Sequence, residues 1–226
     1  TMTEQQDVSV FVIKDCALAA IATGLRAQNL RELRDHLTGI HLGCIYYHFW
    51  GGLLQPRFDD PEYNNDFASW VRHALQDNKL GERLGVIDPA DFHDIEALRQ
   101  ELIDVIETRL DELEFHPWAR RDQQFHFVRA QIVVFDTGKR ILRPRDLRAV
   151  VPSLSIGSIY YHVIDARRRE PQRVDDIRAW LQQFGDQYAV LCDRLAGIDP
   201  YFITLTELRR ALDTVIAECP FDGGAA

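Results

Sequence analysis

The chain has 226 residues, of which 46% are apolar and 27% are charged, a composition typical of one large or two small globular domains and not of a disordered chain. Its formal net charge is −9 with histidine counted as neutral, which argues against a general nucleic-acid binder, because counterion release needs a basic surface. No run of about 18 apolar residues predicts a membrane span. The first residues lack the features of a signal peptide and the four cysteines form no CxxC pair, so we expect a cytoplasmic protein with reduced thiols.

The beginning of the chain carries signals for both a strand and a helix. Val8, Val10 and Val12 alternate with polar neighbours, which predicts a short strand. The alanine-rich segment 17–22 is more typical of a helix, and the Thr-Gly pair at 23–24 is interpreted as a turn that leads into the next helix. Leucines at positions 30, 33 and 37 predict the start of that helix.

The rest of the first half is predicted to be helical. An Ile-Tyr-Tyr-His segment at 45–48 follows a turn, which favours a helix start. Apolar residues around Trp70 predict a second helix. The apolar stripe at 95–113 predicts a third and clearest helix, with Asp94 at its N-terminal cap.

The second half of the chain repeats these motifs in the same order. Thr-Gly at 23–24 returns at 137–138, Ile-Tyr-Tyr-His at 45–48 returns at 159–162, Asp66 and Trp70 return as Asp176 and Trp180, and Ile-Asp-Pro at 87–89 returns at 198–200. Such ordered self-similarity is the signature of an internal repeat. We therefore predict a tandem duplication with a first unit at residues 11–114 and a second unit at residues 125–219.

The repeat also sets the predicted fold class. We expect a mainly α protein of two pseudo-symmetric helical units, with short strands at the start of each copy. Residues 115–124 are predicted to be a linker, in which Phe115 and Trp118 pack inward. The second copy closes with a helix whose N-terminus carries a capping box at 204–207.

The Tyr-Tyr-His segments are the first candidates for a functional site. Adjacent helical residues point about 100° apart, so two tyrosines and a histidine cannot share one direction. One interpretation is structural, with a buried tyrosine and a satisfied core histidine. The alternative is a polar cleft in which Asp66 orients His48 as a general base and Tyr47 donates a hydrogen bond. The binding candidates are Tyr46, Tyr47, His48, Asn65, Asp66, Tyr160, Tyr161 and His162.

Other motifs carry less weight. His41, Cys44 and His48 share a helical face, but the two histidines are about 10 Å apart along the axis, which is too far for one metal ion, so no metal and no cofactor are predicted. The Asp-Thr-Gly triplet at 136–138 resembles that of aspartic proteases, but the matching triplet at 22–24 lacks the second acid. No nucleotide-binding or nucleophile-elbow signature is present.

The charge is unevenly divided. Residues 1–114 carry 10 Lys and Arg against 21 Asp and Glu, a net of −11, and residues 115–226 carry 16 against 14, a net of +2, which together give −9. The arginine cluster of the second half is interpreted as a solvated surface, as an anion site, or as a dock for the acidic half of another copy in a homo-oligomer. The anion-binding candidates are Arg140, Arg143, Arg145, Arg167, Arg168 and Arg169.

The order of the motifs resembles a prokaryotic family of unknown function. The first half matches its pattern nearly throughout, including Asn-Asp-Phe-Ala-x-Trp at 65–70. The second half departs from it at 175–180, which reads Asp-Asp-Ile-Arg-Ala-Trp. The resemblance implies a cytoplasmic prokaryotic protein but brings no activity, substrate or cofactor.

Two classes of function therefore remain open. The favoured hypothesis is a non-catalytic protein that binds a ligand or a protein, or acts as a regulator, through a cleft near the Tyr-Tyr-His segments. The alternative is a small enzyme whose site lies in the first repeat, with His48 as base and Asp66 as its orienter. A minor alternative is anion or nucleic-acid binding through the arginine cluster.

Overall fold

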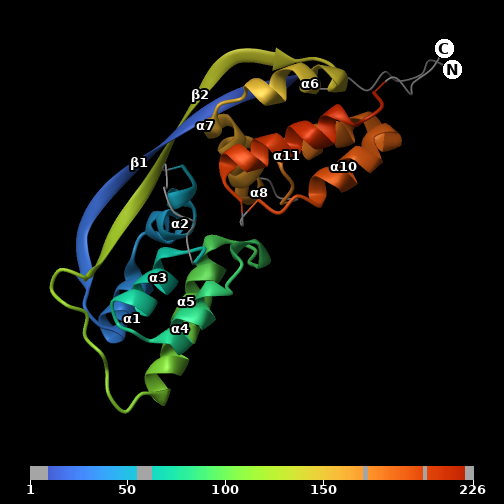
Figure 1. Ribbon diagram of the computed structural model, residues 1–226. Helices are drawn as coiled ribbons and strands as arrows, with labels where there is room; N and C mark the ends of the chain where they lie inside the picture. The colour runs from blue at the N-terminus through green and yellow to red at the C-terminus, as the bar shows by residue number, and fades with distance from the viewer. Residues whose placement is uncertain (1–9, 55–62, 170–172, 201–202, 222–226) are drawn as a thin grey trace, which may run out of the picture. The chain divides into compact units, whose positions relative to one another are not determined.

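The computed structural model describes residues 10–54, 63–169, 173–200 and 203–221 (Figure 1). Two strands of 17 residues each, β1 (Phe11–Ala27) and β2 (Phe125–Ile141), pair in a two-stranded sheet. The prediction of a mainly α protein with only short strands is therefore wrong. The alanine-rich segment 17–22 lies inside β1, because pairing with β2 outweighs the local helix propensity of alanine. Val8, which the alternation also assigns to a strand, lies outside the described residues.

The recurring Thr-Gly pairs lie inside the strands, where the sequence predicts turns. The Thr23 hydroxyl donates to the Phe127 carbonyl and the Thr137 hydroxyl donates to the Ile13 carbonyl, each at 2.6 Å, so the two strands run antiparallel. The glycine after each threonine has a φ of 79° or 75°, a left-handed conformation that favours glycine. Such a glycine within a strand is typical of a β-bulge, which explains why the pair recurs without a turn.

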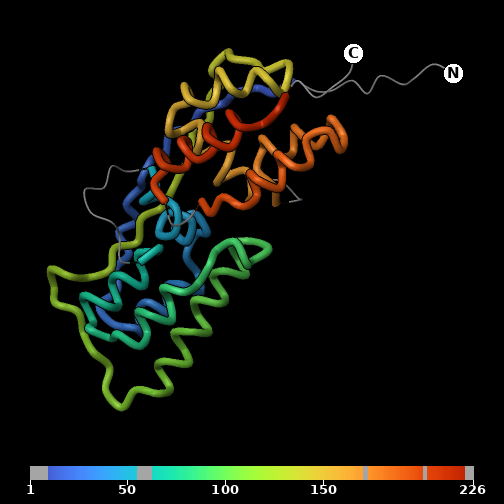
Figure 2. Tube along the Cα trace, turned by 45° about the vertical axis from the view of Figure 1, so that its right-hand side comes forward, coloured from blue at the N-terminus to red at the C-terminus, as the bar shows by residue number. Residues whose placement is uncertain are grey.

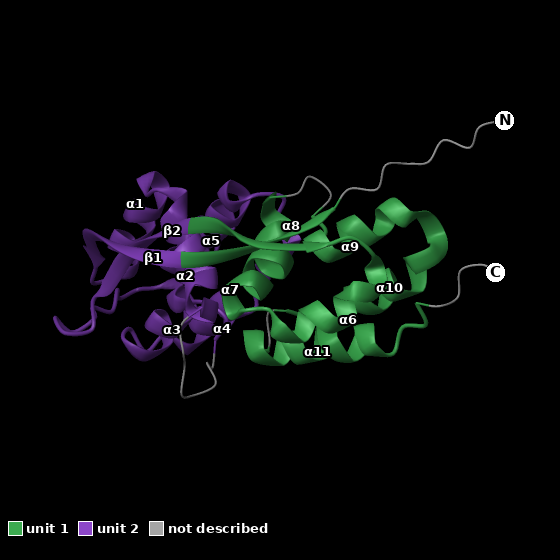
Figure 3. Ribbon diagram, turned by 90° about the horizontal axis from the view of Figure 1, so that it is seen from above, with its two compact units in different colours: residues 1–17, 133–226 green, residues 18–132 purple. Residues whose placement is uncertain are grey.

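The predicted tandem duplication is not shown by the structure. The chain divides into unit 1, residues 1–17 and 133–226, and unit 2, residues 18–132 (Figure 3). Each unit takes a part of β1 and a part of β2. The boundaries between the units therefore fall within the strands, and the units differ from the predicted ranges 11–114 and 125–219.

The predicted linker is irregular but does not bury its aromatic side chains. Phe115 is 86% exposed and Trp118 is 64% exposed, so the prediction that they pack inward is wrong. The segment is held by its backbone instead, since the Ala119 N–H donates to the Gln28 carbonyl at 2.7 Å. Ala119 itself is buried.

Unit 2 is built around its longest helix, α5. Its helical segments are α1 (Leu30–Gly39), α2 (Leu42–Trp50), the 3₁₀ turn η1 (Gly51–Leu54), α3 (Asp66–His73), α4 (Asn78–Gly85), the 3₁₀ turn η2 (Pro89–Asp91) and α5 (Ile95–Glu112). α5 contacts α1, α2 and α4, while α3 packs against α4. An Asn or Asp side chain caps the N-terminus of α1, α3, α4 and α5 and accepts an otherwise unpaired backbone N–H, which fixes where each helix begins.

Unit 1 packs its helices around α11. Its helical segments are η3 (Pro144–Asp146), α6 (Leu147–Val150), η4 (Val151–Ser153), α7 (Ile156–Ile159), the π-helical turn η5 (Tyr160–Asp165), α8 (Ala166–Arg169), α9 (Asp176–Leu181), η6 (Gln182–Tyr188), α10 (Ala189–Ala196) and α11 (Leu205–Ala217). The helix α11, red in Figure 2, contacts α6, α7 and α10. Thr204 and Glu207 form the predicted capping box at its N-terminus. In the described part of the chain, no helix combines the length and apolar character needed to cross a membrane.

Candidate functional site

His48 lies on α2 between two hydrogen-bond partners, with 4% of its surface exposed. Its Nδ1 is 2.9 Å from Oδ2 of Asp66, the first residue of α3, and its Nε2 is 3.2 Å from the backbone nitrogen of Val128 on β2. A backbone N–H can only donate, so Nε2 is the acceptor and Nδ1 carries the proton given to Asp66. This hydrogen-bond pattern assigns a neutral imidazole that links α2 to both α3 and β2.

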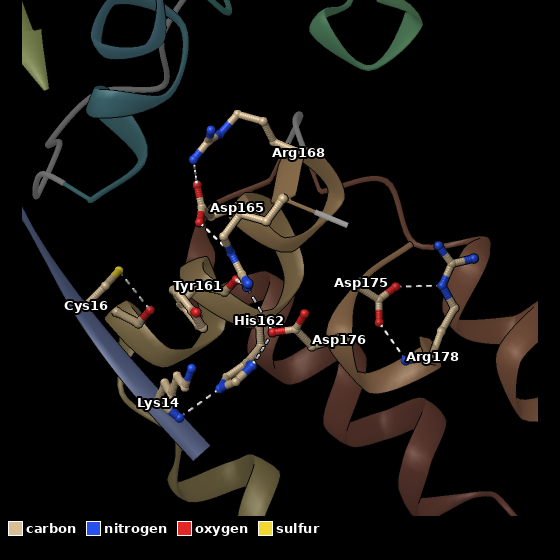
Figure 4. A network of polar contacts seen from close by, with 11 residues as sticks. Lys14, Cys16, Tyr161, His162, Asp165, Arg168, Asp175, Asp176 and Arg178 are labelled. Carbon is tan, nitrogen blue, oxygen red and sulfur yellow. Dashed lines mark hydrogen bonds and ion pairs between the residues drawn. The ribbon is translucent and has the colours of Figure 1, made fainter. Parts of the chain in front are cut away.

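His162 makes the same set of bonds within unit 1 (Figure 4). Its Nδ1 is 2.7 Å from Oδ2 of Asp176, the first residue of α9, and its Nε2 accepts the backbone N–H of Lys14 on β1 at 2.9 Å. We call His48 with Asp66 and Val128, and His162 with Asp176 and Lys14, the two histidine clamps. Each clamp ties a strand to two helical segments of its own unit.

Aromatic rings enclose both imidazoles. The Phe125 ring lies 4.7 Å from the His48 ring in unit 2. In unit 1, the Phe11 ring lies 5.1 Å from the His162 ring and 5.3 Å from the ring of Trp180, which is buried. These rings bury the two imidazoles, and a low local dielectric strengthens the hydrogen bonds that the imidazoles make.

The carboxylates of the two clamps differ in their surroundings. The Asp176 side chain is 16% exposed and accepts a second bond, from Nη2 of Arg169 at 3.0 Å. The Arg169 guanidinium also lies 3.9 Å from the centre of the Tyr161 ring, and its Nε donates to Asp165 at 2.8 Å. The Asp66 side chain is 44% exposed, and no lysine or arginine among the described residues pairs with it. Within the described residues, the carboxylate of the first clamp therefore has no lysine or arginine partner.

An open cavity of about 410 Å³ lies beside Asp66 in unit 2. This volume falls within the range of small-molecule sites. The Trp70 indole N–H donates to the Gln123 carbonyl at 2.7 Å and so fixes one wall. The cavity is lined by His48, Asp66, Ser69, Trp70, His73, Ala74, Gln123, Gln124, Phe125 and His126. Among the described residues of this lining, Asp66 is the one with a formal charge when histidine is counted as neutral.

The remaining binding candidates lie outside the cavity lining. Of the repeated tyrosines, Tyr47 is half-buried, and the other three, Tyr46, Tyr160 and Tyr161, are buried. None of these four is among the residues that line the described cavity. Asn65 is 3% exposed and caps α3, because its side chain accepts the Ala68 N–H and donates to the Leu84 carbonyl, each at 2.9 Å. Asn65 therefore positions Asp66 by fixing where α3 begins.

The arginine candidates bind mainly carboxylates of their own chain. The pairs are Arg140–Asp136, Arg143–Asp146, Arg168–Asp165 and Arg169–Asp165. The pKa of Asp136 falls to about 2, chiefly because the Arg140 side chain donates to it. Arg145 is exposed, and among the described residues the Nε of the half-buried Arg167 has no hydrogen-bond partner. Much of the positive charge of this cluster is thus neutralised within the chain.

His41 and Cys44, the other members of the metal set considered above, serve the fold. The Nδ1 of His41 accepts the Gly43 N–H at 2.9 Å and caps α2. Cys44 is buried, and burial raises the pKa of its thiol, which disfavours the thiolate that a metal needs. The described residues contain no group of three or more His, Cys, Asp or Glu side chains that could hold a metal ion.

Part of the cavity lining carries only a weak sequence signal. His126 lies between Phe125 and Phe127, both buried in β2, while His126 itself is exposed. The alternation of a strand could have placed it on the opposite face from these two aromatics. His73 belongs to the last turn of α3, on the same helix as Asp66, and no motif singles it out.

A close contact between α7 and β1 carries no sequence signal. A Cβ added to Gly157 would lie 2.2 Å from Oδ1 of Asp15 and 2.3 Å from the carbonyl oxygen of Cys16. The Cys16 thiol in turn donates to the Gly157 carbonyl at 3.3 Å (Figure 4). Only glycine allows this approach, and no local pattern predicts a contact between segments so far apart in the chain.

Comparisons with known proteins identify the family but no activity. The family described as "Family of unknown function (DUF5752)" matches residues 8–217, and the chain belongs to it. This confirms the prediction of an uncharacterised family. No curated protein matches the chain. A solved structure, "The structure of OrfY from Thermoproteus tenax", is similar, with 28% identity, a TM-score of 0.80, and coverage of 94% of this chain and 96% of that chain.

Proposed function

We propose that this member of a family of unknown function is a non-catalytic binding protein that holds a small molecule in the cavity of unit 2. One observation carries the proposal: the half-exposed Asp66 carboxylate lines a cavity of about 410 Å³ and is bonded to a buried imidazole. A site of this kind combines an aromatic wall with a fixed polar group, as ligand sites commonly do.

The alternative, an enzyme with His48 as general base, has less support. A general base needs a lone pair within reach of the proton that it removes. The Nε2 of His48 already accepts the Val128 N–H, and its Nδ1 proton is donated to Asp66. His48 is therefore better suited to hold Asp66 in one orientation at the cavity wall.

A thermal-unfolding screen tests the proposal. The purified chain is mixed with acetate, inorganic phosphate, glucose or ethylguanidinium at equal ionic strength, and the unfolding midpoint is measured. A ligand present at about tenfold above its Kd stabilises the folded state by about 1.4 kcal/mol, which raises the midpoint measurably. We expect at least one probe to do so.

The matched control fills the cavity. Ser69→Trp places a large side chain in the lining from the middle of α3, and circular dichroism and the midpoint without ligand check that the variant folds. The proposal requires that the responding probe no longer shifts this variant. An equal shift in both proteins, or no shift with any probe, contradicts a binding site in this cavity.

A further inference from the structure

We infer that the cavity beside Asp66 binds a small organic cation that carries a guanidinium group. This inference rests on the proposed function and adds the chemical class of the ligand. Asp66 supplies the formal negative charge of the lining, and no lysine or arginine among the described residues neutralises it. An anionic ligand would meet this charge, and no described residue of the lining carries a formal positive charge to offset it.

The clamp leaves Asp66 charged and partly unbonded. His48 donates one hydrogen bond to Oδ2 but brings no positive charge, because its Nε2 accepts a backbone N–H and the imidazole is neutral. In the described structure the second oxygen, Oδ1, accepts no hydrogen bond. The carboxylate can therefore receive a ligand donor without breaking the clamp.

Unit 1 contains a guanidinium on the corresponding carboxylate. Oδ2 of Asp176 accepts the Nδ1 proton of His162 at 2.7 Å (Figure 4). The same oxygen accepts a hydrogen bond from Nη2 of Arg169 at 3.0 Å. The same guanidinium is stacked over the Tyr161 ring at 3.9 Å. The chain thus demonstrates that the carboxylate of a histidine clamp holds a guanidinium and its histidine together.

The residue types of the cavity wall favour a guanidinium over a compact ammonium ion. Trp70 and Phe125 line the cavity next to Asp66. A planar guanidinium stacks on aromatic rings and presents parallel donors to a carboxylate, and it is more weakly hydrated than an ammonium ion. A carboxylate and aromatic rings, the two kinds of group that a guanidinium binds, are therefore present in one cavity.

A titration with ethylguanidinium tests the inference. Binding to the wild-type chain is followed by the shift of backbone amide NMR signals in α3. Asp66→Asn keeps an oxygen that accepts from His48 but removes the charge, so it should weaken binding about ten- to a hundredfold, the worth of one hydrogen bond to a charged group. Asp176→Asn is the matched control, and it should leave the Kd at the cavity unchanged.

A second arm uses the guanidinium that the chain already contains. Arg169→Ala removes it from Asp176 and should lower the unfolding midpoint of the chain. Ethylguanidinium should restore part of that loss, since it can occupy the vacated place. Arg143→Ala is the control, because it removes a guanidinium from an exposed ion pair with Asp146. Ethylguanidinium should not raise the unfolding midpoint of this variant.

The outcomes separate this inference from the proposed function. One outcome is that acetate, phosphate or glucose binds, that Ser69→Trp abolishes this binding, and that ethylguanidinium does not bind. The proposed binding function then stands and the guanidinium inference is overturned. If no probe binds, both are overturned. Equal binding of ethylguanidinium to the wild type and to Asp66→Asn, or no restoration of Arg169→Ala, also overturns the inference.

Discussion

Replacing His162 with leucine tests whether a histidine clamp holds β1 to the helices of unit 1. Leucine has a similar size and keeps the apolar packing, but it loses both hydrogen bonds. The Lys14 N–H then lacks its acceptor at 2.9 Å, which costs about 1–3 kcal/mol for a backbone donor left unpaired. Asp176 loses a bond at 2.7 Å but keeps that of Arg169, so this loss adds about 1 kcal/mol. The free energy of unfolding should fall by about 2–4 kcal/mol.

Urea denaturation followed by circular dichroism measures this loss, with His93→Leu as the matched control. The side chain of His93 is 79% exposed, so its replacement should change the free energy of unfolding by less than about 0.5 kcal/mol. If His162→Leu unfolds at the same urea concentration as His93→Leu, the clamp contributes nothing to stability and the reasoning is wrong.

Three further predictions concern other parts of the fold. Gly157→Ala should lower the free energy of unfolding by about 1–3 kcal/mol in urea denaturation, because the added Cβ would overlap the backbone of Cys16. Gly39→Ala is the control and should not lower it, because nothing lies within 4 Å of the added Cβ. Hydrogen bonds from Arg83, Lys79 and Arg109 lower the pKa of Glu112 from 4.5 to about 2, so its ionised form stabilises the fold above pH of about 4.5 and this contribution is lost as the pH falls toward 2. Glu112→Gln should therefore unfold at a lower urea concentration than the wild type near pH 7 and at the same concentration near pH 2. Burial and two nearby carboxylates raise the pKa of Cys16 to about 12, so a thiol reagent should modify this residue only after unfolding, as peptide mass mapping would show.

The local features of the fold were accessible from the sequence. The helix at 95–113 was predicted from its apolar stripe, and the structure has α5 at Ile95–Glu112 with Asp94 as its cap. The recurrence of Asp66 with the Ile-Tyr-Tyr-His segment pointed to a contact between Asp66 and His48, and the two side chains are hydrogen-bonded. These signals are local or repeat within the chain, which is why sequence reasoning detects them.

The two long strands could not be found in the same way. Residues 17–22 are rich in alanine, and only pairing with a strand more than a hundred residues away makes them extended. The division of the chain within the strands was out of reach for the same reason, since each compact unit takes part of both strands. The hydrogen bond from the Val128 N–H to Nε2 of His48 could not be predicted either, because the donor and the acceptor belong to distant segments. The proposed role of His48 as a support and not a base rests on this contact together with the one to Asp66.

The most direct measurement is the tautomer of His48, read from the long-range ¹H–¹⁵N NMR spectrum of the imidazole rings at neutral pH. A support that accepts a backbone N–H through Nε2 must be neutral and protonated on Nδ1. We therefore predict the Nδ1–H tautomer for both His48 and His162, with Val128 and Lys14 amides that exchange slowly with solvent. A His48 protonated on Nε2, or one whose Nε2 exchanges between protonated and free forms, would contradict the clamp and restore the general-base interpretation.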